Sequence, residues 1–148
     1  MYQHILVATD GSERAMRAVE HSVALASKLG AKLTVLTVTR MWNAMEMAQE
    51  ARLGHRNAPE EFERKAQTEA KDILARAEKT ALAAGVVCAS VHIPDQSPGK
   101  GIIETAEAQH CDLIVMASHG RGKVGQLILG SHVNDVLSHS NVPMLVVH

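Results

Sequence analysis

Apolar positions along the chain fall into two patterns. Short, continuous apolar runs with β-branched residues predict buried strands, and the apolar positions between them recur every three or four residues, which predicts amphipathic helices. The five predicted strands are His4 to Ala8, Leu33 to Val38, Val86 to Ile93, Asp112 to Met116 and Met144 to Val147. Because strands alternate with helices along the whole chain, we predict an α/β fold with a mostly parallel sheet.

Boundary signals support the predicted helices. Ser12, a preferred N-cap residue, precedes a helix that ends at Gly30. A long helix is predicted from Pro59 to Gly85, and a shorter one follows over 102–110. The apolar face of the long helix carries Phe62, Ala66, Ala70, Ile73, Ala77 and Ala81. The segment from Arg40 to Ala58 has no clear period, and we interpret it as a mobile connection with a few core-facing residues.

Length and composition limit the classes of function. The 148 residues fit a single domain covering 1–148. A net charge of −1 and an aromatic content of only 2% argue against nucleic-acid binding. No apolar run approaches the ~20 residues that span a bilayer, and the chain start shows no signal-peptide pattern, so we expect a cytoplasmic protein without membrane contact. Cys88 and Cys111 form no CxxC pair and are expected to be reduced, buried thiols.

The stretch from Cys111 to Ser131 combines a strand, a glycine-bearing loop and a helix start. Glycines let backbone amides approach an anion, and a helix start presents unpaired N–H groups with the positive end of the dipole, so we predict phosphate binding here. Two stock motifs fit less well. The G-x-G-x-x-G run at 120–125 follows the fourth strand rather than the first, and no acidic residue follows within 136–148. The sequence GQLILGS at 125–131 lacks the lysine of a P-loop.

A third pattern extends over the whole chain. Ala117 and Gly120, followed after nine residues by Gly130 and Ser131, resemble the nucleotide-binding signature of the universal stress protein family, G-x2-G-x9-G-[ST]. ILVATDGS at 5–12 resembles the first strand and turn of the family, and the element order matches across essentially all 148 residues. The resemblance implies a single-domain, doubly wound, Rossmann-like fold with a five-stranded parallel sheet of order 3-2-1-4-5 and helices on both faces. It also implies binding of ATP, with Mg²⁺ as a candidate companion ion.

The resemblance assigns a role to each site residue. The implied nucleotide-binding residues are Ala8, Thr9 and Val38 at the adenine, Asp10 at the ribose, Met116 and Ala117 over the base and sugar, His119 and Gly120 near the phosphates, and Gly130, Ser131, His132 and Val133 around the phosphates. In this strand order the connection reverses direction between the first and fourth strands, so a crevice opens at their carboxyl ends. Asp10 and Ala117 are therefore expected to meet there, while an alternative for Asp10 is to cap amides of its own turn.

Ala117 stands where the signature has its first glycine. Alanine is the smallest departure from glycine, but its methyl group occupies space next to the ribose. It also strains the backbone wherever φ must be positive. Whether Ala117 can take the place of the signature glycine therefore depends on its backbone conformation.

Two further groups of polar residues have simpler interpretations. His132, Asp135 and His139 share one face of the last helix, but without a fourth ligand we interpret it as a solvated face rather than a zinc site. Ser118 and His119 are residue types of a hydrolase triad. Adjacent side chains on an extended chain point in opposite directions, so we reject that interpretation.

The leading hypothesis is an ATP-binding regulatory module of the stress response that is not an enzyme. One alternative is a weak ATPase, although the sequence offers no clear general base or carboxylate pair near the loop. The other is a dimerisation or chaperone-like module that binds no nucleotide. The resemblance also implies a homodimer. The apolar strand from Met144 to Val147 fits a homodimer because an exposed strand edge can pair with a second copy.

Overall fold

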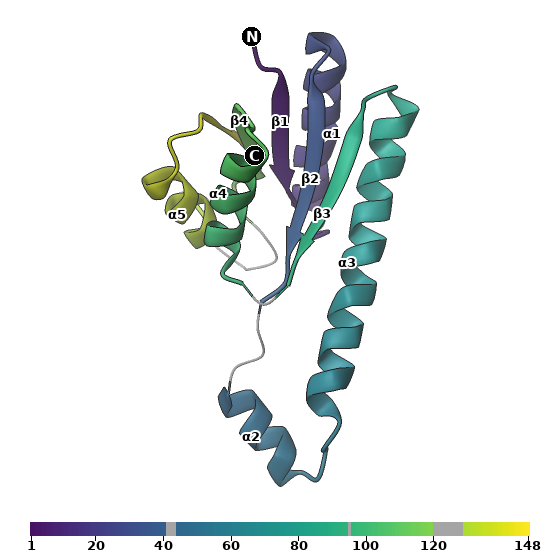
Figure 1. Ribbon diagram of the computed structural model, residues 1–148, viewed down its shortest axis with the longest axis vertical. Coiled ribbons are helices and arrows are strands. Elements are labelled where there is room, and N and C mark those ends of the chain that lie inside the picture. Colours follow the sequence, from purple (N-terminus) through teal and green to yellow (C-terminus); the bar gives the residue numbers. More distant parts are fainter. Residues whose placement is uncertain (41–43, 95, 120–128) are drawn as a thin grey trace.

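The computed structural model describes residues 1–40, 44–94, 96–119 and 129–148 (Figure 1). Within these ranges, five strands form one parallel sheet in the order β3-β2-β1-β4-β5. The strands are β1 (His4–Ala8), β2 (Lys32–Val38), β3 (Cys88–Ile93), β4 (Leu113–Ala117) and β5 (Met144–Val147). The helices are α1 (Glu13–Leu29), α2 (Ala44–Arg52), α3 (Ala58–Ala83), α4 (Pro98–Ala108) and α5 (Ser131–His139). The predicted fold class and strand order are confirmed.

Helices cover both faces of the sheet. α1 and α3 pack against one face, and α4 and α5 pack against the other (Figure 1). Successive residues of the central strand β1 alternate between the two cores: Ile5 and Val7 belong to the α1–α3 side and Leu6 to the α4–α5 side. Burial on both faces explains why the strands are continuous apolar runs in the sequence. Among the helices described, none combines the length and apolar character that a membrane span needs.

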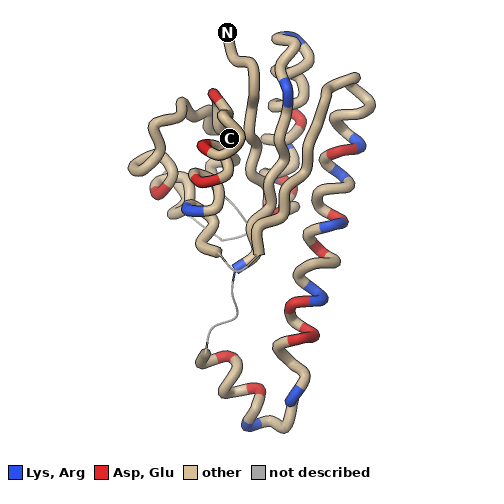
Figure 2. The backbone as a smooth tube through the Cα atoms, viewed as in Figure 1, with Lys and Arg blue, Asp and Glu red and all other residues tan. Residues whose placement is uncertain are grey.

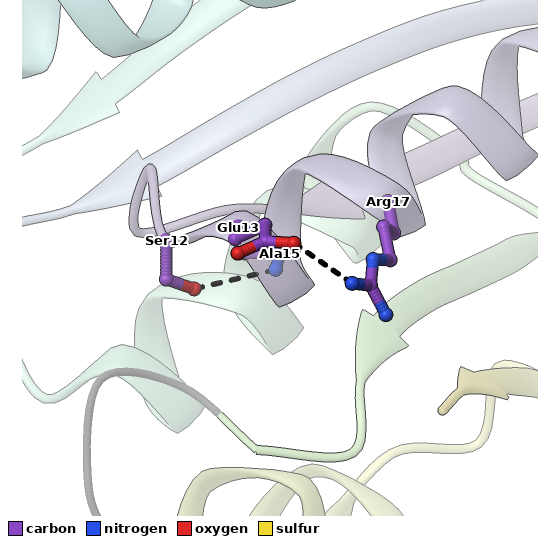
Figure 3. Close-up of polar contacts among 4 residues, drawn as sticks. All are labelled: Ser12, Glu13, Ala15 and Arg17. Carbon is purple, nitrogen blue, oxygen red and sulfur yellow. Dashed lines mark hydrogen bonds and ion pairs between the residues drawn. The ribbon is translucent and has the colours of Figure 1, made fainter.

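The boundaries of α1 follow the predicted signals. The Ser12 hydroxyl accepts a hydrogen bond from the Ala15 amide at 3.3 Å, and Glu13 pairs with Arg17 at 2.8 Å one turn later (Figure 3). Gly30 ends the helix in the left-handed conformation with a φ of 67°. The N-cap fixes the direction in which the chain leaves β1, and thus the position of the turn at the carboxyl end of that strand.

The prediction for the segment from Arg40 to Ala58 is wrong, because it contains the helix α2. None of the α2 residues is buried. Met45 within this helix and Leu53 directly after it are strongly exposed. Alanine, methionine, glutamate, glutamine and arginine make up this helix, and all have high helix propensity, a signal that does not depend on periodicity. α2 and the first turns of α3 extend beyond the carboxyl edge of the sheet (Figure 1).

The two cysteines are free thiols in different environments. Cys111 is buried as predicted, and burial, followed by the charge of neighbouring Asp112, raises the pKa of its thiol to about 11. Cys88 is only half-buried, so the prediction for it is wrong, since an edge strand leaves part of its surface open. Burial also raises the pKa of Cys88, with Glu78 as the second cause. Both thiols are therefore protonated at neutral pH, which makes them poor nucleophiles.

Candidate functional site

A cavity of ≈720 Å³ lies where the carboxyl ends of the central strands meet the helices. Its volume falls within the range of about 300–1,000 Å³ that small-molecule sites occupy. The predicted site residues among its lining are Ala8, Thr9, Asp10, Val38, Met116, Ala117, His119, Gly130, Ser131, His132 and Val133. The remaining predicted residue, Gly120, lies outside the described residues. The structure therefore brings four separate parts of the sequence together around one cavity.

The turn after β1 forms one side of the cavity. The Thr9 amide donates to the Leu36 carbonyl at 2.9 Å, which extends the β1–β2 pairing into the turn. The Oδ1 atom of Asp10 accepts the Ser12 amide at 2.9 Å, and Asp10 also lines the cavity. Asp10 thus holds the turn in shape, as the alternative interpretation expected, and it does so at the wall of the cavity.

The end of β4 lies beside that turn. Val7 and Val115 are register partners, so Ala8 and Met116 continue side by side toward the carboxyl edge. Ala117 is still part of β4, and His110 is the only non-glycine residue with a positive φ among the residues described. The alanine that replaces the first signature glycine is therefore not strained. Ala117 lies in the wall of the cavity.

His119 is buried next to this strand end, and its contact corrects one prediction. Its Nδ1 atom lies 3.1 Å from the Ser118 hydroxyl, so the two adjacent side chains converge instead of pointing in opposite directions. The reason is that Ser118 forms a bend after the strand rather than extended backbone. Ser118 is buried and is not among the residues that line the cavity, so its hydroxyl does not face a ligand there. His119 does line the cavity.

The first turn of α5 closes the cavity from the other side. The Gly130 amide donates to the Ser118 carbonyl at 2.9 Å, which holds the helix start against the end of β4. A Cβ atom at Gly130 would lie only 3.2 Å from that carbonyl oxygen, so the close approach depends on glycine. No described side chain caps α5, and the backbone of Ser131, His132 and Val133 faces the cavity region with the positive end of the helix dipole. This geometry favours an anion.

The start of α4 contributes a second helix terminus that the sequence analysis missed. Pro98 and Ile102 line the cavity, and within the described residues Ser97 makes no side-chain cap to α4. Two glycines allow α4 to pack closely: a Cβ atom at Gly99 would meet Asp135 Oδ2 at 1.9 Å, and one at Gly101 would meet Val38 at 3.0 Å. The glycine spacing in 98–101 was the available signal. It indicates close packing rather than a flexible turn.

Asp135 is therefore not simply part of a solvated face, since its carboxylate contacts the start of α4. Its Oδ1 atom also lies 3.1 Å from His139 Nδ1 one turn later. Among the described residues, no group of three or more potential metal ligands of the histidine, cysteine, aspartate and glutamate types is present. The contacts of Asp135 connect α5 to α4 and help to set the width of the cavity between their first turns.

α3 supplies a wall of the cavity that the sequence analysis also missed. Its cavity-lining residues are Phe62, Lys65, Ala66, Glu69, Ala70 and Ile73. The sequence placed the apolar members on one face of a helix, but gave no reason to place that face over a ligand site rather than over the sheet. The available signal was the length of the helix: at 26 residues it is much longer than the strands it covers.

The family model for the universal stress protein family matches residues 1–148. The chain belongs to the universal stress protein family. It is 34% identical over 147 residues to a universal stress protein of Thermus aquaticus, encoded in the 3′ region of QAH/OAS sulfhydrylase, and the match covers 99% of each chain. It is also 30% identical to universal stress protein MJ0577 of Methanocaldococcus jannaschii, with 99% of this chain and 95% of the relative covered.

Solved structures of the universal stress protein family share this architecture. The structure of MJ0577 superposes with a TM-score of 0.81 at 28% sequence identity, covering 99% of this chain and 96% of the other. A universal stress protein in complex with cAMP superposes with a TM-score of 0.70 at 27% identity, covering 99% of this chain and 97% of the other. The family fold can therefore hold an adenine nucleotide, as that relative does.

Proposed function

We propose that this universal stress protein binds ATP in the cavity and acts as a small regulatory module of the stress response. The observation that carries the proposal is the juxtaposition of Asp10, at the end of β1, with the first turn of α5, which no described side chain caps, across a cavity of ≈720 Å³. A carboxylate suits ribose hydroxyl groups, and a helix start suits phosphates. The relative that binds cAMP supports the choice of an adenine nucleotide.

The chemistry of the lining agrees with this orientation. Val38 and Met116 supply apolar surface for a purine base at the ends of β2 and β4. The first phosphate would then lie at the amides of Ser131 to Val133, with the Ser131 hydroxyl as a further donor. Carboxylates at the cavity are Asp10 on one element and Glu69 on another. A magnesium ion would therefore be held chiefly by the phosphates and water.

We propose that binding, rather than turnover, is the role of the site. One oxygen of the Asp10 carboxylate already accepts the Ser12 amide, and the Ser118 hydroxyl lies outside the cavity lining. The contact of Asp10 and the position of Ser118 favour a structural task for residues that could otherwise act as base or nucleophile. A phosphate-release assay on the purified protein measures turnover directly, and several turnovers per minute with ATP would contradict this part of the proposal.

We also propose a homodimer that pairs through β5. This strand forms one edge of the sheet, where it pairs with β4. Leu145 on it is 38% exposed, so this edge strand presents an apolar side chain to solvent. An apolar strand edge is a template for a second strand, and a two-fold axis would bring the same edge of a second copy against it.

Thermal unfolding tests the central proposal. A ligand at 100 times its dissociation constant adds about 2.7 kcal/mol to the stability of the folded state. A domain of this size shifts by about 2–4 °C per kcal/mol, so saturating ATP is expected to raise the Tm by about 5–11 °C. GTP is the matched control for the base. An unchanged Tm at millimolar ATP, with nucleotide-free protein confirmed by mass spectrometry, would support a module that binds no nucleotide.

A further inference from the structure

The outer part of the cavity is built by α3 and reaches beyond the sheet. A Cβ atom at Gly11 would lie 2.6 Å from the Ile73 side chain, which places Ile73 directly against the β1 turn. Lys65 also lines the cavity but precedes Ile73 by eight residues. At 1.5 Å per residue, its backbone lies about 12 Å farther along the helix axis, away from that turn. Lys65 therefore faces whatever part of a ligand extends outward from the Asp10 end of the cavity.

The cations around this outer part of the cavity differ in whether they already form an ion pair with a described residue. The two strong cations of the described lining are Arg40 and Lys65. The Arg40 guanidinium lies 3.1 Å from Glu46 on α2, so that charge is already paired. Lys65 is exposed, and it takes part in none of the ion pairs formed among the described residues. α3 carries cations and anions along its length (Figure 2), and Lys65 is the cation of this helix that lines the cavity.

We infer that Lys65 binds the distal phosphates of the nucleotide and makes the site select a nucleoside triphosphate over a monophosphate. The inference rests on the proposed nucleotide binding at this same cavity. With the ribose at Asp10 and the first phosphate near the start of α5, a monophosphate ends close to the sheet. The lysine side chain then has no phosphate within reach. A triphosphate tail extends outward, where a flexible ammonium group can pair with it as a point charge.

Titration calorimetry on the full chain tests this selection with ATP and AMP as the probes. Lys65→Met is expected to weaken ATP binding by about 3- to 5-fold, the upper part of the range for an exposed charge pair, and to change AMP binding less than about 2-fold. Lys71→Met is the matched control, because Lys71 is an exposed lysine of α3 outside the cavity lining, and both affinities should stay within about 2-fold. Lys65→Arg keeps the charge and should retain most of the preference for ATP.

The outcomes separate this inference from the proposed function. If the wild-type protein binds ATP but Lys65→Met has the same ratio of ATP to AMP affinity, the inference is wrong and the nucleotide proposal stands. An equal loss of both affinities would also overturn it, because a general loss does not depend on the distal phosphates. If the wild-type protein binds neither nucleotide, both fail together. The apo Tm of Lys65→Met should match wild type, since the side chain is exposed.

Discussion

Gly11 shows how a single residue places one wall of the cavity. Its φ of 79° lies in the left-handed region that favours glycine, and Ile73 of α3 occupies the space where a side chain would begin. The Arg76 guanidinium also reaches the Gly11 carbonyl at 3.4 Å. The turn after β1 and the middle of α3 are thus in direct contact because no Cβ atom separates them.

Gly11→Ala should therefore be costly for two separate reasons. The left-handed backbone costs about 1–2 kcal/mol for alanine, and the overlap with Ile73 adds about 1 kcal/mol or more. Gly85→Ala is the control, since Gly85 has a φ of 68° but nothing within 4 Å of an added Cβ atom. Urea unfolding should give a larger loss of stability for Gly11→Ala. Equal losses for the two variants would show that Ile73 moves aside without cost.

Two other residues show what the sequence could and could not reveal at this scale. The spacing from Ala117 to Ser131 directed attention to one region of the fold, and eleven of the twelve predicted residues line one cavity there. The bend at Ser118, which turns its side chain toward His119, could not be predicted. That bend depends on hydrogen bonds of the Ser118 amide to Val147 and of the Ser118 carbonyl to Gly130, which join distant parts of the chain.

At the scale of elements, β1 and β4 are joined at their amino ends by the turn before β4. The Asp112 carboxylate accepts the amides of Gln3 and His4 at 2.8 and 3.0 Å. Partial burial acts to raise the pKa of this carboxyl group, but the hydrogen bonds from Gln3 and His4 outweigh it and lower the pKa. The charged form of Asp112 thus holds the entry of β1 against that of β4, at the edge of the sheet opposite the cavity.

A pH-dependent loss of stability follows from that lowered pKa. The contribution of Asp112 is fully present above the ordinary carboxyl pKa of about 3.9 and is lost as the pH falls through the lower folded-state pKa. Because solvent screens this partly exposed carboxylate, Asp112→Asn should cost only about 0.5–1 kcal/mol at pH 7, and the difference from wild type should shrink below about pH 4. Chemical unfolding between pH 2.5 and 7 measures it. Asp72→Asn, at an exposed position of α3, should change little, and a constant gap for Asp112→Asn across that range would contradict the assignment.

The sequence did not reveal that α3 lines the cavity. Its apolar face is predicted correctly, and Ala70, Ile73, Leu74, Ala77 and Ala81 are its buried residues. The apolar residues of α3 have the same spacing where the helix packs on the sheet and where it lines the cavity. Periodicity therefore cannot show where the core ends and the cavity wall begins. α2 was missed for a related reason: an exposed helix has no apolar period to detect.

At the scale of the whole molecule, the topology of the sheet determines which groups meet at its carboxyl edge. The helices α1, α4 and α5 all begin at the carboxyl edge, because each follows a parallel strand. Their positive ends gather there by topology alone. This arrangement could be predicted once the strand order was inferred. The contribution of β5 to the site could not, because it depends on the contact between Val147 and the bend at Ser118.

The proposed dimer is best tested by a substitution on β5 rather than by its removal. Val147 is buried in the α1–α3 core, and its carbonyl accepts the Ser118 amide at 2.8 Å, so a truncated chain would lose core packing together with the edge.

Leu145→Lys leaves these contacts in place and puts a charge on the exposed side of the strand, which disfavours pairing of two edges. Sedimentation should then show monomers where the wild-type protein forms dimers. Leu137→Lys, at an exposed leucine of α5 rather than of β5, is the control and should remain dimeric. A Leu145→Lys protein that stays dimeric, or a Leu137→Lys protein that dissociates, would place the interface elsewhere. ATP binding that persists in the monomer would further show that each cavity functions within one chain.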